Sequence, residues 1–202
     1  MAGKLIALAA VCAALYGQDL KPASDDLKPA IDNERVKVWD VTWAQGESNP
    51  AAADGDVVVM KLTGADAGTA NFSAKGAERK PGPVGDRSLV IELKDHPRAQ
   101  YENKTGYPPA FPRPHVNKLF ENDRVIVWSY RWNPGEPTPM HFHDKDVVVV
   151  YLEPTALVST TPAGAKTLNE YKAFDIRFNR GNRTHTESLA HGTGSAMMME
   201  LK

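Results

Sequence analysis

Short apolar runs separated by turn-forming residues dominate the pattern of this chain. The runs are rich in valine, tryptophan and tyrosine, and they end at glycine, proline, asparagine or aspartate. β-Branched and aromatic side chains favour strands, and the residues that interrupt them are typical of tight turns. The pattern therefore predicts an all-β fold. Residues 166–174 also fit a helix, although an edge strand or a loop fits them equally well.

Two segments of the chain resemble each other. Residues 32–50 read DNERVKVWDVTWAQGESNP, and residues 121–139 read ENDRVIVWSYRWNPGEPTP. Identical residues stand at nine positions: Asn33/Asn122, Arg35/Arg124, Val36/Val125, Val38/Val127, Trp39/Trp128, Trp43/Trp132, Gly46/Gly135, Glu47/Glu136 and Pro50/Pro139. Such self-similarity predicts one module that occurs twice, over residues 30–97 and 118–202, with a shorter first copy.

The likeness resumes in two valine-rich runs, DVVVMKL from Asp56 and DVVVVYL from Asp146. The second run has no polar face, which indicates a strand covered on both sides. Between the copies, residues 98–117 contain four prolines, which lack the backbone N–H that a strand ladder needs, so we expect an extended strap. All four tryptophans occur at matching positions, which favours core packing over sugar stacking.

The first residues have the pattern of a signal peptide. A lysine precedes an apolar run from Leu5 to Tyr16, and polar residues follow, so we expect cleavage near the end of residues 1–17. The run is shorter than the roughly 20 residues that cross a bilayer as a helix, and no membrane span is predicted. Export to the periplasm or secretion would leave a chain without cysteine, because Cys12 is the single cysteine. The alternative is a buried N-terminal helix or strand.

The charge balance of the chain bears on whether nucleic acid is an expected partner. Lysine and arginine total 24 and aspartate and glutamate total 25, which gives a formal net charge of −1. A protein that binds nucleic acid commonly carries a basic surplus to neutralise phosphates, so nucleic acid is not an expected partner. The hydrophobic fraction of 42% is ordinary for a folded protein and unlike that of a disordered chain.

A His-x-His pair, His141 and His143, follows Gly135 after five intervening residues. Side chains two apart on a strand point to the same face, so both imidazoles can reach one divalent cation. The alternative is two polar residues on a solvated face. In the first copy Ala52 and Asp54 stand at the equivalent positions, so that copy cannot hold the same metal. We expect it to be structural and to cover the strand edges and apolar face of its partner.

With this spacing the chain resembles the cupin superfamily, whose first motif is Gly-x5-His-x-His followed by a glutamate, and whose second motif supplies another histidine. The resemblance covers both copies. It implies two double-stranded β-helix (jelly-roll) barrels, the N-terminal one truncated, and one divalent ion of manganese, iron, nickel or zinc. His185, in the segment Gly181-Asn-Arg-Thr-His185, best fits the second motif. Sheet edges in such proteins often pair, which makes a homodimer possible.

The carboxylates match the resemblance less closely. The family has a glutamate three or four residues after the pair, whereas this chain has Asp146 after two, with Asp144 nearer still. We expect Asp146 as the fourth ligand, and a turn-capping carboxylate is the alternative. Glu187 would share the strand face of His185, and it is a candidate for a further ligand, a partner of a ligand or a catalytic acid/base.

The predicted metal site therefore consists of His141, His143, Asp146 and His185. The resemblance implies a metal-dependent enzyme acting on a small organic molecule as a dioxygenase, isomerase, decarboxylase or hydrolase. Two alternatives remain open. One is a non-catalytic module that binds a small molecule or a metal in a pocket lined by Val148, together with Val150 and Leu152. The other is a structural or partner-binding protein whose histidines are satisfied core residues.

Overall fold

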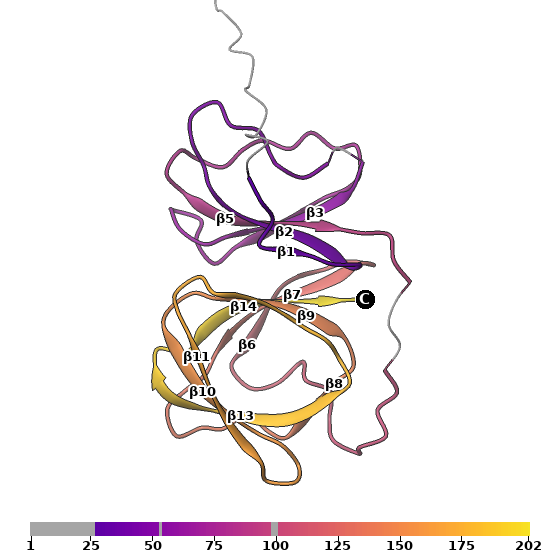
Figure 1. The fold of residues 1–202 in the computed structure, drawn as a ribbon, viewed down its shortest axis with the longest axis vertical. Helices are drawn as coiled ribbons and strands as arrows, with labels where there is room; N and C mark the ends of the chain where they lie inside the picture. The colour runs from indigo at the N-terminus through magenta and orange to yellow at the C-terminus, as the bar shows by residue number, and fades with distance from the viewer. Residues whose placement is uncertain (1–26, 53, 98–100) are drawn as a thin grey trace, which may run out of the picture.

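The computed structural model describes residues 27–52, 54–97 and 101–202. Every regular element in these ranges is a strand, and the strands form three antiparallel sheets (Figure 1). The all-β prediction is confirmed. The predicted signal peptide, residues 1–17, lies outside the described residues. Within the described part of the chain, no helix has the length and apolar character to span a membrane.

The N-terminal half folds into one five-stranded sheet with the order β1-β2-β5-β3-β4. Its strands are β1 Ile31–Asp32, β2 Val36–Thr42, β3 Asp56–Lys61, β4 Ala70–Ser73 and β5 Arg87–Leu93. We expected a truncated barrel here. The described residues instead form an open sheet, because the chain between β4 and β5 is a loop and supplies no strand for an opposite wall.

The C-terminal half forms two sheets that face each other (Figure 1). One sheet has the order β12-β9-β14-β7-β6, and the other has the order β11-β10-β13-β8. The strands are β6 Val116–Glu121, β7 Val125–Arg131, β8 His141–His143, β9 Asp146–Tyr151, β10 Thr155–Thr160, β11 Lys166–Tyr171, β12 Ile176–Asn179, β13 Arg183–Gly192 and β14 Ser195–Leu201. The ambiguous segment 166–174 thus contributes an edge strand, β11, and no helix.

The sheet that contains β9 and β14 is covered on both faces. Every residue of β9 is buried, which confirms the prediction from its missing polar face. In β14, Met197 and Met199 belong to the core shared with the N-terminal sheet, whereas Met198 lies in the interior of the C-terminal half. Successive side chains of a strand point to opposite faces, so these methionines serve two cores. The three sheets therefore stack as three layers, with this one in the middle.

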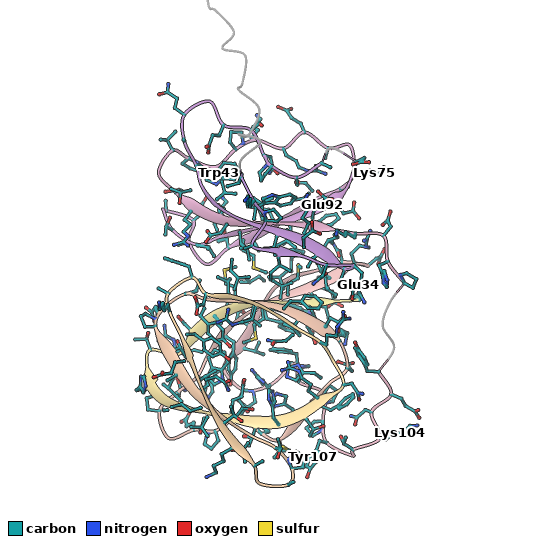
Figure 2. The ribbon with its side chains drawn as sticks, viewed as in Figure 1. Glu34, Trp43, Lys75, Glu92, Lys104 and Tyr107 are labelled. Carbon is teal, nitrogen blue, oxygen red and sulfur yellow. The ribbon has the colours of Figure 1, made fainter. Side chains whose placement is uncertain are left out.

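Side chains fill both spaces between the layers (Figure 2). All four tryptophans are buried, in agreement with the core interpretation. Trp43, labelled in Figure 2, lies on the face of the N-terminal sheet that points away from the C-terminal half. Trp132 lies inside the C-terminal half, where it packs edge-on against Tyr130.

The proline-rich segment runs as a strap along the outer edge of β8. The Ala110 amide donates to the Phe142 carbonyl, and the Phe142 amide donates to the Pro108 carbonyl, both over 2.8 Å. These bonds satisfy an edge that would otherwise present unpaired backbone groups. They also hold Phe111 and Arg113 against the interior of the C-terminal half, where both side chains are largely buried.

Candidate metal centre

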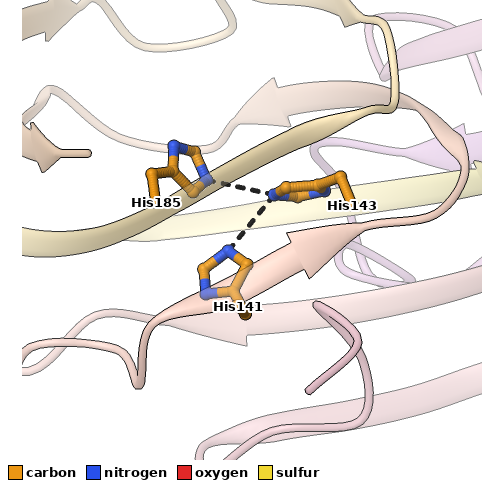
Figure 3. A group of neighbouring side chains, drawn as sticks. All are labelled: His141, His143 and His185. Atoms are coloured by element: carbon orange, nitrogen blue, oxygen red, sulfur yellow. Dashed lines mark hydrogen bonds between the residues drawn. The ribbon is translucent and has the colours of Figure 1, made fainter. Parts of the chain in front are cut away.

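Strand pairing brings three imidazoles together. His141 and His143 are the two ends of β8 and point to the same face. His185 lies on the neighbouring strand β13, directly opposite His141 in the ladder. One ring nitrogen from each histidine lies within 4.8 Å of the other two (Figure 3). The structure thus places together the three histidines that the sequence singles out.

The Nε2 atoms of the three rings lie close together. His143 Nε2 lies 3.2 Å from His141 Nε2 and 3.0 Å from His185 Nε2 (Figure 3). The ring planes stand at 67° to 79° to one another. Two nitrogens that share an ion at about 2.0–2.1 Å, at angles of about 90° to 109°, are separated by roughly 2.8–3.4 Å. The two measured spacings fall in that interval.

Hydrogen bonding alone does not account for these contacts. His141 Nδ1 lies 2.8 Å from the Pro139 carbonyl oxygen, which only accepts, so in the neutral ring Nδ1 carries the proton and Nε2 carries a lone pair. Whether His143 Nε2 is protonated or not, it makes a directed hydrogen bond to only one of its two neighbours. The other close contact is then held by no hydrogen bond. A cation at the centre would remove this conflict, because it accepts a lone pair from each ring.

Burial keeps the three rings neutral. Burial, reinforced by the nearby Arg113 guanidinium, lowers the pKa of His141 to about 4. Burial also lowers the pKa of His185 and holds the pKa of His143 well below its ordinary value. Metal binding requires unprotonated nitrogens. The ligand set is therefore in its binding form at neutral pH.

The ring nitrogens that point away from the centre are fixed in two of the three histidines. His141 Nδ1 donates to the Pro139 carbonyl oxygen. His185 Nδ1 lies 3.0 Å from the Ser159 hydroxyl oxygen on β10. Contacts of this kind orient metal-ligating imidazoles. His143 Nδ1 is buried and has no hydrogen-bond partner among the described residues.

Asp146 does not join the imidazoles. Its carboxylate accepts hydrogen bonds from the Tyr101 hydroxyl at 3.0 Å and the Gly181 amide at 2.8 Å, and the Arg35 guanidinium lies 3.5 Å away. In the described ranges, the group of potential ligand atoms contains the three histidines and no carboxylate. Gly181 has no room for a side chain, because a Cβ there would lie 2.3 Å from the Tyr101 ring.

The alternation of β9 explains this placement. Val147 and Val149 face the interior of the C-terminal half, whereas Val148 and Val150 face the N-terminal sheet. Asp146 lies two residues before Val148, so its side chain points to the same face of the strand as Val148 and Val150. It therefore points away from the imidazoles. Asp144 also lies outside the imidazole group and pairs with its neighbour Lys145.

Glu187 and Arg113 flank the imidazoles. Glu187 Oε2 accepts a hydrogen bond from Trp132 Nε1 at 3.2 Å and lies 3.7 Å from an Arg113 guanidinium nitrogen. Arg113 Nη1 lies 3.0 Å from His141 Nε2. Burial raises the pKa of Glu187, but its electrostatic interactions with His185 and Arg113 outweigh burial and the net shift is downward. Glu187 is therefore an ionised carboxylate at neutral pH.

A cavity of about 160 Å³ adjoins the imidazoles. Polar and aromatic side chains dominate its wall: Arg113, Trp132, His143, Val147, Val149, Tyr151, Ser159, Asn169, Tyr171, Asn179, Arg183, His185, Glu187 and Met198. The expected lining by Val148, Val150 and Leu152 is wrong, because these side chains belong to the core shared with the N-terminal sheet. The cavity wall also contains titratable groups, among them Arg113, Arg183 and Glu187, which that expectation did not include.

Two arginines of this cavity were not predicted. Arg183 lies two residues before His185 on β13, so strand periodicity offered a signal for it. Arg113 reaches the cavity from the strap, and its position depends on how the strap docks on β8. No local pattern in the sequence points to it.

No protein-family model matches the chain, and no curated protein matches its sequence. Solved structures with similar backbones include cupin-domain proteins. A cupin domain from Bordetella pertussis is 23% identical over 48% of this chain and 96% of its own, with a TM-score of 0.39. A cupin 2 conserved barrel domain protein from Leptotrichia buccalis is 10% identical over 85% of this chain and 86% of its own, with a TM-score of 0.48. The polyketide cyclase RemF from Streptomyces resistomycificus is 17% identical over 51% of this chain and 79% of its own, with a TM-score of 0.36.

Proposed function

We propose that this chain is a metal-binding protein of the cupin type, which holds one divalent ion on His141, His143 and His185 and acts on a small organic molecule in the adjoining cavity. The observation that carries the proposal is the convergence of three neutral Nε2 atoms, with spacings of 3.0 and 3.2 Å. Imidazole suits iron, nickel and zinc, whereas manganese favours carboxylate and carbonyl oxygens. The absence of a carboxylate from the described ligand group therefore favours iron, nickel or zinc.

Three protein ligands leave coordination positions free, and a bound ion would polarise a carbonyl or activate water there. The residues of the chain supply the remaining functions. Glu187 is ionised, and Trp132 and Arg113 hold its Oε2. A carboxylate fixed in this way at the cavity wall is placed to accept a proton from a bound molecule.

Three aromatic rings form part of the cavity wall. Tyr151 and Tyr171 stack with their ring centroids 3.7 Å apart, and Trp132 stacks on Tyr151 from inside the C-terminal half. All three residues line the cavity. Where these rings replace water around a bound molecule, each charged group of the cavity acts on that molecule more strongly.

The N-terminal half serves a structural role in this proposal. Its sheet covers the apolar face that β9 and β14 turn outward, with Val58, Met60 and Ile91 in the shared core. Its strand order, β1-β2-β5-β3-β4, corresponds to the order β6-β7-β14-β9-β12 of the middle sheet. This correspondence and the similar sequences support a reduced copy of the same module. Export of the chain, inferred from residues 1–17, is part of the same proposal.

Metal analysis of the purified full chain tests this function. The chain is loaded separately with Zn²⁺, Ni²⁺ and Fe²⁺, dialysed, and analysed for metal per polypeptide, in parallel with His143→Ala and His185→Asn. His191→Ala serves as the matched control, because His191 lies on the same strand with its side chain 67% exposed. We expect one ion per chain in the wild type and the control, and loss in both site variants. A metal-free wild type, or equal metal in all four proteins, would refute the proposal.

A further inference from the structure

The cavity beside the imidazoles carries more positive charge than its own carboxylate balances. Two guanidinium groups, those of Arg113 and Arg183, line it together with one carboxylate, that of Glu187. A divalent ion on three neutral imidazoles adds two further positive charges. The loaded site then has an excess of three positive charges in a partly buried cavity. Uncompensated charge that is shielded from water is costly, so a bound molecule of opposite charge is favoured.

Arg183 has no acidic partner within the described part of the chain. Its Nε donates to the Arg180 carbonyl oxygen at 2.8 Å, and no ion pair involves its guanidinium. The side chain is partly buried at the start of β13 and lines the cavity. Arginine presents paired N–H groups that match the two oxygens of a carboxylate. The remaining donors of Arg183 are therefore available to a molecule in the cavity.

Arg113 becomes available when a metal binds. Its side chain is only 5% exposed, its guanidinium lies over the Tyr130 ring at 4.2 Å, and its buried Nε has no hydrogen-bond partner in the described structure. Its Nη1 donates to His141 Nε2, whose lone pair a metal ion would take. Loading would therefore break that hydrogen bond, and the freed N–H would need a new acceptor. Glu187, at 3.7 Å from the guanidinium, is beyond hydrogen-bond distance.

We propose that the molecule bound in this cavity is a small organic carboxylate, held by Arg113 and Arg183 beside the metal ion. This inference rests on the proposed function, since the charge of the ion and its displacement of Arg113 are both part of the argument. The cavity volume of about 160 Å³ restricts the ligand to a compact acid of a few carbon atoms. A neutral molecule of the same size would leave the excess positive charge of the loaded site unbalanced, because Glu187 is the single carboxylate in the described cavity lining.

Isothermal titration of the zinc-loaded full chain tests the inference. The probes are malonate and acetate, their neutral counterparts malonamide and acetamide, and inorganic phosphate. The proteins are the wild type, Arg183→Gln, Arg183→Lys, Arg113→Gln and the control Arg131→Gln, which changes an exposed arginine at the end of β7. The zinc content of each sample is measured first, so that a failure of the metal site is recognised separately from a failure of the anion site.

We expect the carboxylates to bind the wild type and the control, and the amides to bind neither. Both glutamine variants should retain zinc and bind malonate about tenfold more weakly or worse, since each loses a charge-assisted hydrogen bond. Arg183→Lys should recover part of the affinity. Equal binding of carboxylates and amides, undiminished binding by zinc-loaded Arg183→Gln, or phosphate binding tighter than malonate would each overturn the inference. Loss of zinc from the wild type would refute the metal proposal itself.

Discussion

Arg35 of the N-terminal half forms an ion pair with Asp146 of the C-terminal half, at 3.5 Å. The counterpart of Arg35 in the similar segment, Arg124, pairs in the opposite direction with Asp56 at 2.9 Å. The two halves therefore exchange the same contact in both directions, as the subunits of a twofold dimer do. This exchange gives the aspartate that opens each valine-rich run a role in holding the halves together.

The backbone repeats the exchange. The Arg35 guanidinium donates to the Lys202 carbonyl at 3.4 Å, and the Arg124 guanidinium donates to the Lys94 carbonyl at 3.1 Å. Each of these lysines ends a Glu-Leu-Lys tripeptide at the close of its half. Each half therefore contributes an arginine from the beginning of its similar segment, and this arginine contacts a backbone carbonyl at the end of the other half.

Asp146→Asn separates the structural role from metal binding. Asparagine keeps one oxygen for Tyr101 and Gly181 but turns an amide group toward Arg35, which leaves a buried cation without its counter-charge. Arg35 is 7% exposed and Asp146 is fully buried, so we expect the free energy of unfolding to fall by about 3 kcal/mol. Urea denaturation measures the loss. Metal content should remain one ion per chain; a variant of normal stability that loses its metal would instead make Asp146 a ligand.

The reciprocal pair should contribute less. Arg124 is 35% exposed and Asp56 18% exposed, so water screens this ion pair more strongly. We expect Arg124→Gln to lower the free energy of unfolding by about 1 kcal/mol or less, measured by urea denaturation alongside Arg35→Gln. A loss from Arg124→Gln that equals or exceeds the loss from Arg35→Gln would contradict the burial argument.

The all-β class and the three histidines were predictable from the sequence, because both depend on local periodicity. Valine-rich runs predict strands. Because His141 and His143 are two residues apart, they share one face of their strand wherever that strand lies in the fold. His185 was found by its resemblance to a second motif, and its register opposite His141 could not be foreseen. Local patterns identify which side chains share a strand face, and sheet pairing decides which strands meet.

Asp146 and Arg113 could not be placed in the same way. A turn separates β8 from β9, and the side chains of β9 alternate between faces independently of those of β8. The number of residues between His143 and Asp146 therefore does not reveal to which face Asp146 points. Arg113 enters the site because the strap docks along β8, a contact between distant parts of the chain. The sequence also predicted a truncated barrel for the N-terminal half, whereas the described residues form an open sheet, because the chain between β4 and β5 supplies no strand for an opposite wall.

Glu200 is a buried carboxyl group, and its ionised form destabilises the folded state at neutral pH. Its Oε2 accepts a hydrogen bond from Trp128 Nε1 at 2.9 Å, yet burial raises its pKa above the ordinary 4.5. The folded state therefore binds the proton more tightly than the unfolded state, and the contribution of Glu200 to stability is lost as pH rises through its folded pKa. Glu200→Gln keeps an acceptor for Trp128 without the charge.

We therefore expect Glu200→Gln to raise the free energy of unfolding relative to the wild type, by more at pH 8 than at pH 5. Denaturant unfolding of both proteins at the two pH values measures the difference. An equal difference at both values would show that ionisation of Glu200 has no part in it.

Ser159 should support metal binding through His185. Its hydroxyl lies 3.0 Å from His185 Nδ1, and removal of such a contact typically weakens metal affinity about tenfold or more. We expect this loss in Ser159→Ala, measured by competition with a chelating dye. Thr167→Ala, an exposed change on the edge strand β11, should leave the affinity unaltered. Equal affinities in the two variants would argue against an orienting role for Ser159.

The central claim is that three imidazoles from β8 and β13 share one ion. A crystal of the zinc-loaded full chain, measured at the zinc absorption edge, locates that ion directly through its anomalous signal. We predict a single strong peak at about 2.0–2.1 Å from Nε2 of His141, His143 and His185. A peak bound by fewer than two of these rings, or no peak among them in a chain shown to contain zinc, would contradict the claim.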